Sequence, residues 1–166
     1  MAICQISSIL AKSTLLASVE FLNEIKVQYE RKPVKIGKGT IKRSEDVIPI
    51  LKEIYDLDRI TYQEEVVVLM FDFSQKLIGY FKLSSGGLTS TIVDTRLLFS
   101  VALKSLATGV ILSHNHPSGN LKPSEQDKSL TDRIKQASRL LDINFLDHII
   151  VTPEFKYYSF ADEGKI

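Results

Sequence analysis

The fold of this chain is decided by residues 113–127, which read SHNHPSGNLKPSEQD and join two different kinds of element. The residues just before this stretch, GVIL at 109–112, predict a short central strand that is buried on both faces. Pro, Ser, Gly and Asn in the middle of the stretch are turn formers and predict a loop. From Ser124 to about Leu141, apolar side chains recur at helical spacing. The stretch therefore predicts a strand, a loop and a long helix in succession.

The segments on both sides extend this pattern into a mixed α/β fold. Upstream, residues 64–83 combine two β-rich runs around a turn and predict a hairpin, and Asp94 can cap a helix. Ser44 can cap an earlier helix that ends near Asp58. Downstream, the sequences NFLDHIIV and KYYSF predict two more strands. We therefore expect a mixed sheet flanked by helices.

Residues 1–43 are predicted to form an extension before a single domain of residues 44–166. Apolar residues between Ile6 and Ile25 recur at mostly helical spacing, which favours one or two amphipathic helices. Residues 31–43 are basic and rich in turn formers, a composition typical of a linker. The total length of 166 residues agrees with about one domain.

The charge and cysteine content exclude several classes of protein. The chain has 21 Lys and Arg residues against 20 Asp and Glu residues, so it lacks the basic surface that binding to a phosphate backbone requires. Its single cysteine, Cys4, excludes an intramolecular disulfide and a metal site built from several thiolates. No apolar run approaches the roughly 18 residues that span a membrane. We expect a soluble, cytoplasmic protein in which any metal is bound by His and carboxylate side chains.

Two of the three histidines, His114 and His116, lie at the carboxyl end of the predicted central strand. Because one residue separates them, their side chains project to the same side of the strand, where two imidazoles can converge on one ion. Asp127 falls in the first turn of the next helix, where its carboxylate can face the strand end. Two His and one Asp leave a fourth position for water, the arrangement of catalytic rather than structural zinc.

A second interpretation of these residues needs no metal. Ser124 and Asp127 have the spacing of a capping box, in which a serine and an acidic residue three positions later satisfy free backbone N–H groups at a helix start. HNHPSGN would then be a polar turn after a strand. The two interpretations are compatible, because a cap can also orient a ligand, and the spacing alone leaves both open.

The same residues resemble the JAMM (MPN+) metalloprotease motif, in which H-x-H-P is followed at a fixed distance by S-x-x-D. The HNHPSG form with PSEQD is similar to the RadC-like JAB domain branch of that superfamily. EEVVVLMFD at residues 64–72 resembles the strand that begins with the family's catalytic Glu, and LDHIIV at residues 146–151 resembles its closing strand. The resemblance covers roughly residues 44–162 and implies a JAMM/MPN-like, cytidine-deaminase-like α/β fold.

This resemblance implies a role for five residues. It makes His114, His116 and Asp127 the ligands of a Zn²⁺ ion, with water as the fourth ligand. It makes Glu64 the general base and acid, which takes a proton from this water and later protonates the leaving amine. It makes Ser124 a hydrogen-bond donor to the oxyanion of the tetrahedral intermediate.

The choice between Glu64 and Glu65 as the catalytic acid rests on the family motif. Alternation along the strand places their side chains on opposite faces, so only one of them can face the site. Both faces are apolar, and periodicity therefore does not choose between them. Counting back from Asp72, which fits the strand-ending Asp of the motif, places the catalytic residue at Glu64.

Three further residues near the motif are predicted to support the site. Asn115 should point away from the ligand side and act in the turn or behind the ligands. His148 is expected to be a buried, hydrogen-bonded histidine rather than a fourth ligand, because a fourth protein ligand would fill the position that hydrolysis needs. Gly119 is expected to supply a permissive backbone conformation.

The leading function hypothesis is a zinc-dependent hydrolase that cleaves peptide or isopeptide bonds in a protein or peptide substrate. The alternative is a RadC-type DNA repair or mobile-element-associated protein, which acts on or near nucleic acid through the basic residues between Arg31 and Arg43. Residues 1–43 show no clear form of the helix-hairpin-helix module that longer RadC-like proteins carry. The near balance of charges ranks hydrolysis above DNA binding. A complete set of ligands argues against a third hypothesis, a non-catalytic scaffold.

Overall fold

The computed structural model describes residues 41–85 and 93–166. The predicted helices of the extension, and most of the basic segment with which the nucleic-acid hypothesis is concerned, lie outside the described residues. Within the described ranges, no helix is long and apolar enough to cross a membrane. In chain order the elements are the 3-10 helix η1 (Ser44–Val47), α2 (Ile48–Ile54), β1 (Glu65–Phe71), β2 (Leu77–Ser85), α3 (Thr95–Lys104), β3 (Gly109–Asn115), α4 (Glu125–Leu140), β4 (Asn144–Val151) and β5 (Tyr157–Ser159).

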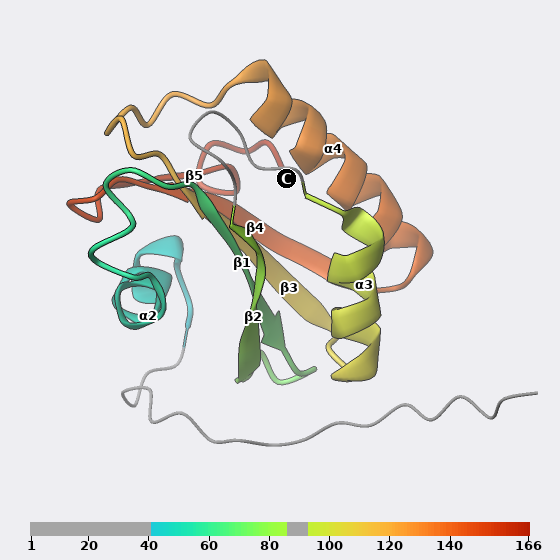
Figure 1. The fold of residues 1–166 in the computed structure, drawn as a ribbon. Coiled ribbons are helices and arrows are strands. Elements are labelled where there is room, and N and C mark those ends of the chain that lie inside the picture. The colour runs from blue at the N-terminus through green and yellow to red at the C-terminus, as the bar shows by residue number, and fades with distance from the viewer. Residues whose placement is uncertain (1–40, 86–92) are drawn as a thin grey trace, which may run out of the picture.

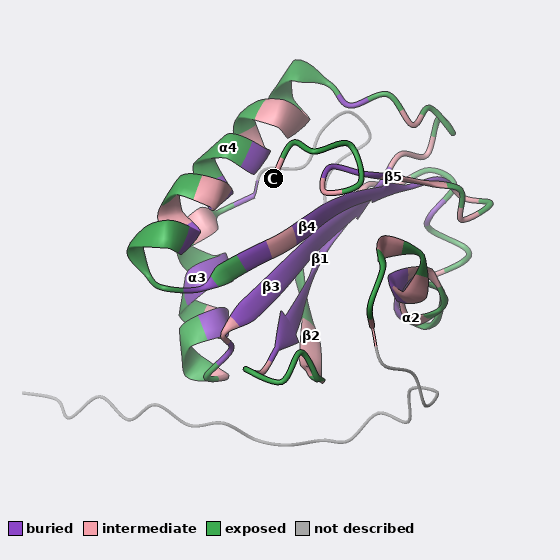
Figure 2. Cartoon of the chain, turned by 180° about the vertical axis from the view of Figure 1, so that it is seen from behind, coloured by how far each residue is buried: buried purple, intermediate pink, exposed green. Residues whose placement is uncertain are grey.

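The five strands form one mixed sheet in the order β2-β1-β3-β4-β5 (Figure 1). β1 is antiparallel to both of its neighbours, β2 and β3, and the predicted hairpin is confirmed. β3 and β4 run parallel, as expected for two strands joined by the helix α4. All seven residues of β3 are buried (Figure 2), because β3 is central and both faces of the sheet are covered there. The prediction of a central strand buried on both faces is therefore confirmed.

The two faces of the sheet are covered by different helices, α3 and α4 on one side and η1 with α2 on the other (Figures 1 and 2). Alternation along β1 divides its side chains between two cores. Val66, Val68 and Met70 pack with α3 and α4, whereas Val67 and Leu69 belong to the core beneath α2. This arrangement confirms the expected mixed α/β sheet flanked by helices.

The helix starts follow the predicted caps at two of three positions. The Asp94 carboxylate accepts a hydrogen bond from the Arg96 backbone N–H at 2.9 Å and starts α3. Ser124 is the N-cap of α4, with the capping box that its spacing predicts. The prediction that Ser44 caps the first helix is wrong, since Arg43 holds that position. The Ser44 hydroxyl instead lies 2.9 Å from each of two carboxylates, the buried Asp147 in β4 and Asp162, which are distant partners that the local sequence does not reveal.

Candidate metal centre

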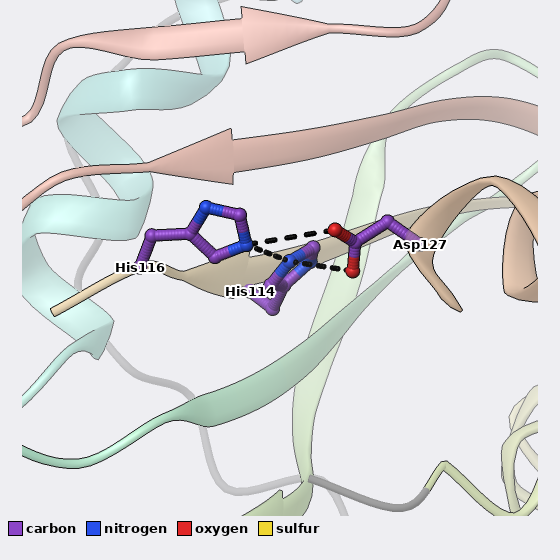
Figure 3. Close-up of side chains that lie close together, drawn as sticks. All are labelled: His114, His116 and Asp127. Atoms are coloured by element: carbon purple, nitrogen blue, oxygen red, sulfur yellow. Dashed lines mark hydrogen bonds and ion pairs between the residues drawn. The ribbon is translucent and has the colours of Figure 1, made fainter. Parts of the chain in front are cut away.

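Three potential metal ligands converge where β3 ends and α4 begins. The Nε2 atoms of His114 and His116 lie 3.0 Å apart (Figure 3). The Asp127 carboxylate lies opposite them, 3.2 Å from His114 Nε2 and 3.6 Å from His116 Nε2. Among the described residues, this is the group of three or more His, Cys, Asp and Glu side chains that could hold a metal ion, with its ligand atoms all within 4.8 Å of one another.

The loop after β3 brings Asp127 back over the strand end. The backbone N–H of Gly119 donates to the His116 carbonyl at 3.0 Å, which closes a turn. Gly119 has a φ of +74°, a conformation that side chains with a Cβ rarely adopt, so its predicted role is confirmed. α4 then starts at Ser124, and its first turn directs the Asp127 carboxylate at the two imidazoles (Figure 3).

The surroundings of His116 leave its Nε2 free for a metal. Its other ring nitrogen, Nδ1, lies 2.6 Å from the Asn120 carbonyl oxygen. A carbonyl oxygen can only accept, so Nδ1 must carry the hydrogen. In the neutral ring Nε2 then has a lone pair, and this lone pair points toward Asp127 and His114.

A chain of hydrogen bonds sets the same tautomer in His114. The Thr131 hydroxyl donates its single hydrogen to the Asp127 backbone carbonyl at 2.7 Å, so it can only accept from His148 Nδ1, also at 2.7 Å. His148 Nε2 must therefore accept a hydrogen from His114 Nδ1, which lies 2.9 Å away. This leaves a lone pair on His114 Nε2, the atom that faces the centre.

His148 supports a ligand and is not itself one. Its side chain is fully buried, and both of its ring nitrogens are used by Thr131 and His114. Burial holds the pKa of His148 well below its usual value, so the ring is neutral, as the hydrogen-bond chain requires. The prediction of a buried, hydrogen-bonded His148 is confirmed.

The charges around the ligands favour a cation between them. The hydrogen bond to Asp127 raises the pKa of His116 more than burial lowers it, and the Asn120 carbonyl adds to this increase. Burial alone would raise the pKa of Asp127, but its side-chain contacts with His114 and His116 outweigh burial and hold that pKa far below its usual value. Two imidazole lone pairs and one ionised carboxylate that meet at one point match the donors that Zn²⁺ prefers in sites that keep an open position.

Metal binding at this centre is expected to weaken as the pH falls. In the folded, metal-free protein the pKa of His116 lies above 6.5, so protonated His116 stabilises the fold fully below pH 6.5 and this stabilisation is lost as the pH rises through the folded pKa. A metal requires the neutral ring and must displace that proton. Below the folded pKa, the Kd for Zn²⁺ should therefore rise about tenfold per pH unit. Calorimetric titrations in two buffers of different ionisation enthalpy measure this proton release, and a Kd that is constant from about pH 5.5 to 7.5 would contradict it.

The pairing of β1 with β3 separates Glu64 from Glu65. Val66 lies directly opposite His114, and residues opposite each other in an antiparallel pair share a face. Glu64, two residues before Val66, therefore belongs to the face of the candidate metal ligands, and its charge is one of those that raise the pKa of His116. Glu65 lies on the other face, only 3% exposed, where its carboxylate is 3.4 Å from Lys82 Nζ. The structure thus brings Glu64 toward the ligands and turns Glu65 away from them.

Ser124 is held in the helix cap. Its hydroxyl donates to Asp127 Oδ2 at 2.6 Å and accepts from the Asp127 backbone N–H at 3.1 Å. Its own backbone N–H donates to the same carboxylate oxygen at 2.7 Å. The capping interpretation is therefore confirmed, and it coexists with the metal interpretation, because Asp127 presents Oδ1 to His114 while Oδ2 caps the helix. The role of Ser124 toward an oxyanion stays a prediction.

Sequence reasoning missed three contributions to this centre. The Thr131 hydroxyl and the Asn120 carbonyl fix the two histidine tautomers, and a backbone carbonyl leaves no signal in a sequence. The Asn115 side chain points away from the ligands, as predicted, but it contacts three backbone groups of the segment before β1. The spacing of Thr131, one helical turn after Asp127, is the only local sign that it lies near the site.

A family comparison assigns the domain. The family model of the RadC-like JAB domain matches residues 41–165, most of the chain. The chain belongs to the RadC-like JAB domain family. The residues matched include Glu64 and all three candidate metal ligands, so this RadC-like JAB domain contains a His-His-Asp group that could bind a metal.

Several bacterial proteins are similar to this RadC-like JAB domain chain. A UPF0758 protein of Flavobacterium johnsoniae is 44% identical over 135 residues, which are 76% of this chain and 58% of that protein. A UPF0758 protein of Thermotoga maritima is 34% identical over 153 residues, 92% of this chain and 64% of that protein. The chain thus spans about three fifths of the length of these two relatives. Their names state no activity, so the function must be argued from the site.

Proposed function

We propose that this protein is a zinc-dependent hydrolase that cleaves peptide or isopeptide bonds. The observation that best supports the proposal is the convergence of His114, His116 and Asp127, whose ligand atoms lie within 4.8 Å of one another. Both histidines have their Nδ1 atoms engaged, so their Nε2 lone pairs are left for the ion. Membership of the RadC-like JAB family adds support for a metallohydrolase.

The ligands and Glu64 would divide the work of hydrolysis between them. When bound, Zn²⁺ would polarise the scissile carbonyl and lower the pKa of a water molecule to about 7. His114, His116 and Asp127 would hold the ion with one position open to solvent and substrate. Glu64, on the same face, would take the proton of the attacking water as its oxygen bonds to the carbonyl carbon. Glu64 would then give that proton to the leaving nitrogen as the C–N bond breaks, so the carboxylate is restored.

Two measurements test the proposed function: the zinc content of the purified protein and its cleavage of peptide and isopeptide substrates. Protein purified without added metal should contain close to one equivalent of zinc by elemental analysis. It should cleave at least one member of a panel of peptide and isopeptide substrates, and a chelator should stop cleavage until Zn²⁺ is restored. Absence of zinc, or cleavage that a chelator leaves unchanged, would refute the proposal.

Two substitutions at Ser124 distinguish a catalytic hydroxyl from a helix cap. Ser124→Ala removes the hydroxyl and is a poor N-cap, so it should cost about 1 kcal/mol of stability. Ser124→Gly also removes the hydroxyl but should cost only a few tenths of a kcal/mol, because Gly is tolerated at the N-cap. If the hydroxyl donates to the oxyanion, both variants should lose kcat by a similar factor, about 10²-fold. Thermal unfolding and steady-state kinetics measure the two effects. A Ser124→Gly enzyme with the wild-type kcat would leave Ser124 as a cap alone.

A further inference from the structure

Asn115 makes an unusual set of contacts for a residue between two metal ligands. It is fully buried at the end of β3, on the opposite face from His114 and His116. Its Oδ1 accepts a hydrogen bond from the Glu65 backbone N–H at 2.7 Å. Its Nδ2 donates to the backbone carbonyls of Ile60 at 2.9 Å and of Gln63 at 2.8 Å. One side chain of β3 thus binds three backbone groups of the segment that leads into β1.

These contacts require an Asn side chain. Both hydrogens of the amide nitrogen go to carbonyl oxygens, and the amide oxygen takes a backbone N–H, so the orientation of the amide is defined. Asp has the same shape but no donor for the two carbonyls, and Ala has no polar group at all. Loss of the amide would leave three polar groups to find new partners in a place that buries Asn115 completely.

The contacts bracket Glu64. Gln63 comes just before Glu64, and its backbone carbonyl accepts a hydrogen bond from Asn115. Glu65 comes just after Glu64, and its backbone N–H donates a hydrogen bond to Asn115. The peptide bonds of Asn115 join it directly to His114 and His116. A single residue therefore links the backbone on both sides of Glu64 to both candidate imidazole ligands.

We propose that Asn115 is a positioning residue that fixes Glu64 relative to His114 and His116. This inference rests on the proposed function, in which Glu64 moves the proton. Displacement of a reacting group by about 1 Å can cost about 10²-fold in rate. Release of the segment by Asn115→Ala should therefore lower kcat about 100-fold, with KM and zinc content within about twofold of wild type.

A double substitution separates positioning from general support of the fold. If Asn115 acts through Glu64, Asn115→Ala should change the residual kcat of a Glu64→Gln enzyme by less than about twofold. Tyr55→Phe is the matched control. It removes the buried 3.1 Å contact between the Tyr55 and Ser113 hydroxyls on the same face of β3 but leaves the segment before β1 intact, so its kcat should equal that of wild type. The proposal would be overturned if Asn115→Ala lowered kcat as much in the Glu64→Gln enzyme as in wild type. It would also be overturned if Tyr55→Phe lowered kcat as much as Asn115→Ala does.

Backbone amide exchange tests the contact without catalysis or metal. In the wild-type protein, the Glu65 amide should exchange as slowly as the amides inside β1, and in Asn115→Ala it should exchange about 10 to 100 times faster while the amides of β4 are unchanged. Rapid exchange of the Glu65 amide in the wild-type protein would by itself overturn the proposal, even where Asn115→Ala does not fold. Absence of zinc or of cleavage in the wild-type protein would instead refute the proposed function. The exchange rate of the Glu65 amide would still show whether Asn115 holds the segment before β1.

Discussion

Replacement of Glu64 by Gln is expected to lower kcat for peptide or isopeptide cleavage about 10³-fold, while the zinc content stays the same. Gln has nearly the shape of Glu but cannot take a proton from the attacking water or return it to the leaving nitrogen. The zinc content should not change, because the candidate metal group consists of His114, His116 and Asp127 and does not include Glu64. Steady-state kinetics and elemental analysis of the same preparation measure both quantities.

Glu65→Gln is the matched control for this experiment. The two acids are adjacent in the sequence, but Glu65 lies on the opposite face of β1, where its carboxylate is 3.4 Å from Lys82 Nζ. Glu65→Gln should therefore keep kcat within about threefold of wild type. It removes the ion pair with Lys82 but keeps an amide oxygen that can accept a hydrogen bond from Lys82 Nζ. The opposite result, with Glu65→Gln inactive and Glu64→Gln active, would place the proton transfer on the other carboxylate and contradict the register of β1 with β3.

Replacement of His116 by Ala is expected to raise the Kd for Zn²⁺ by at least about 100-fold and to abolish cleavage. Loss of a residue that only supports a ligand costs about 10 to 100-fold in metal affinity, so loss of a ligand should cost at least the upper end of that range. His116 suits this test better than His114, because its side chain is partly exposed at the strand end, whereas His114 is bonded to the buried His148. Isothermal titration with Zn²⁺ measures the affinity.

The thermal stability of His116→Ala shows whether the loss is specific. Without metal, its Tm should lie within a few degrees of the metal-free wild type, because the replaced side chain lies at the edge of the core. Added Zn²⁺ should raise the Tm of the wild type and not that of the variant, since a ligand stabilises only the folded state that binds it. An equal rise in both proteins would mean that Zn²⁺ binds elsewhere on the chain.

Elements set by local pattern could be predicted from the sequence. The apolar run before His114 indicates a strand buried on both faces, because neither face of a wholly apolar strand has polar side chains that could contact water. The two histidines at one strand end indicate converging ligands for the same geometric reason. The Ser124 and Asp127 spacing gives the cap of α4, and the structure shows that one carboxylate can cap a helix and face two imidazoles.

The remaining features depend on partners that are distant in the sequence. Glu64 just before β1 and Glu65 at its start look equivalent by periodicity, since both faces of the strand are apolar. The family motif favours Glu64, and the pairing of Val66 with His114 supplies the physical reason. Ser44 looks like a cap, but its hydroxyl contacts the carboxylates of Asp147 and Asp162, which come more than 100 residues later in the sequence. His148 and Thr131 belong to different elements and act on His114 only once α4 has packed on the sheet. Local patterns carry no information about such contacts.

The candidate ligands and the histidine behind them all lie between the start of β3 and the end of β4, in one continuous strand, helix and strand. Glu64 comes from outside this unit and reaches it through the antiparallel pairing of β1 with β3 and the contacts of Asn115. Under the proposed function, metal binding and proton transfer would therefore depend on separate parts of the fold. In the proposed hydrolase, a binding partner or a substitution that displaces the residues before β1 would abolish activity while the metal stays bound, so zinc occupancy would not measure how many molecules are active.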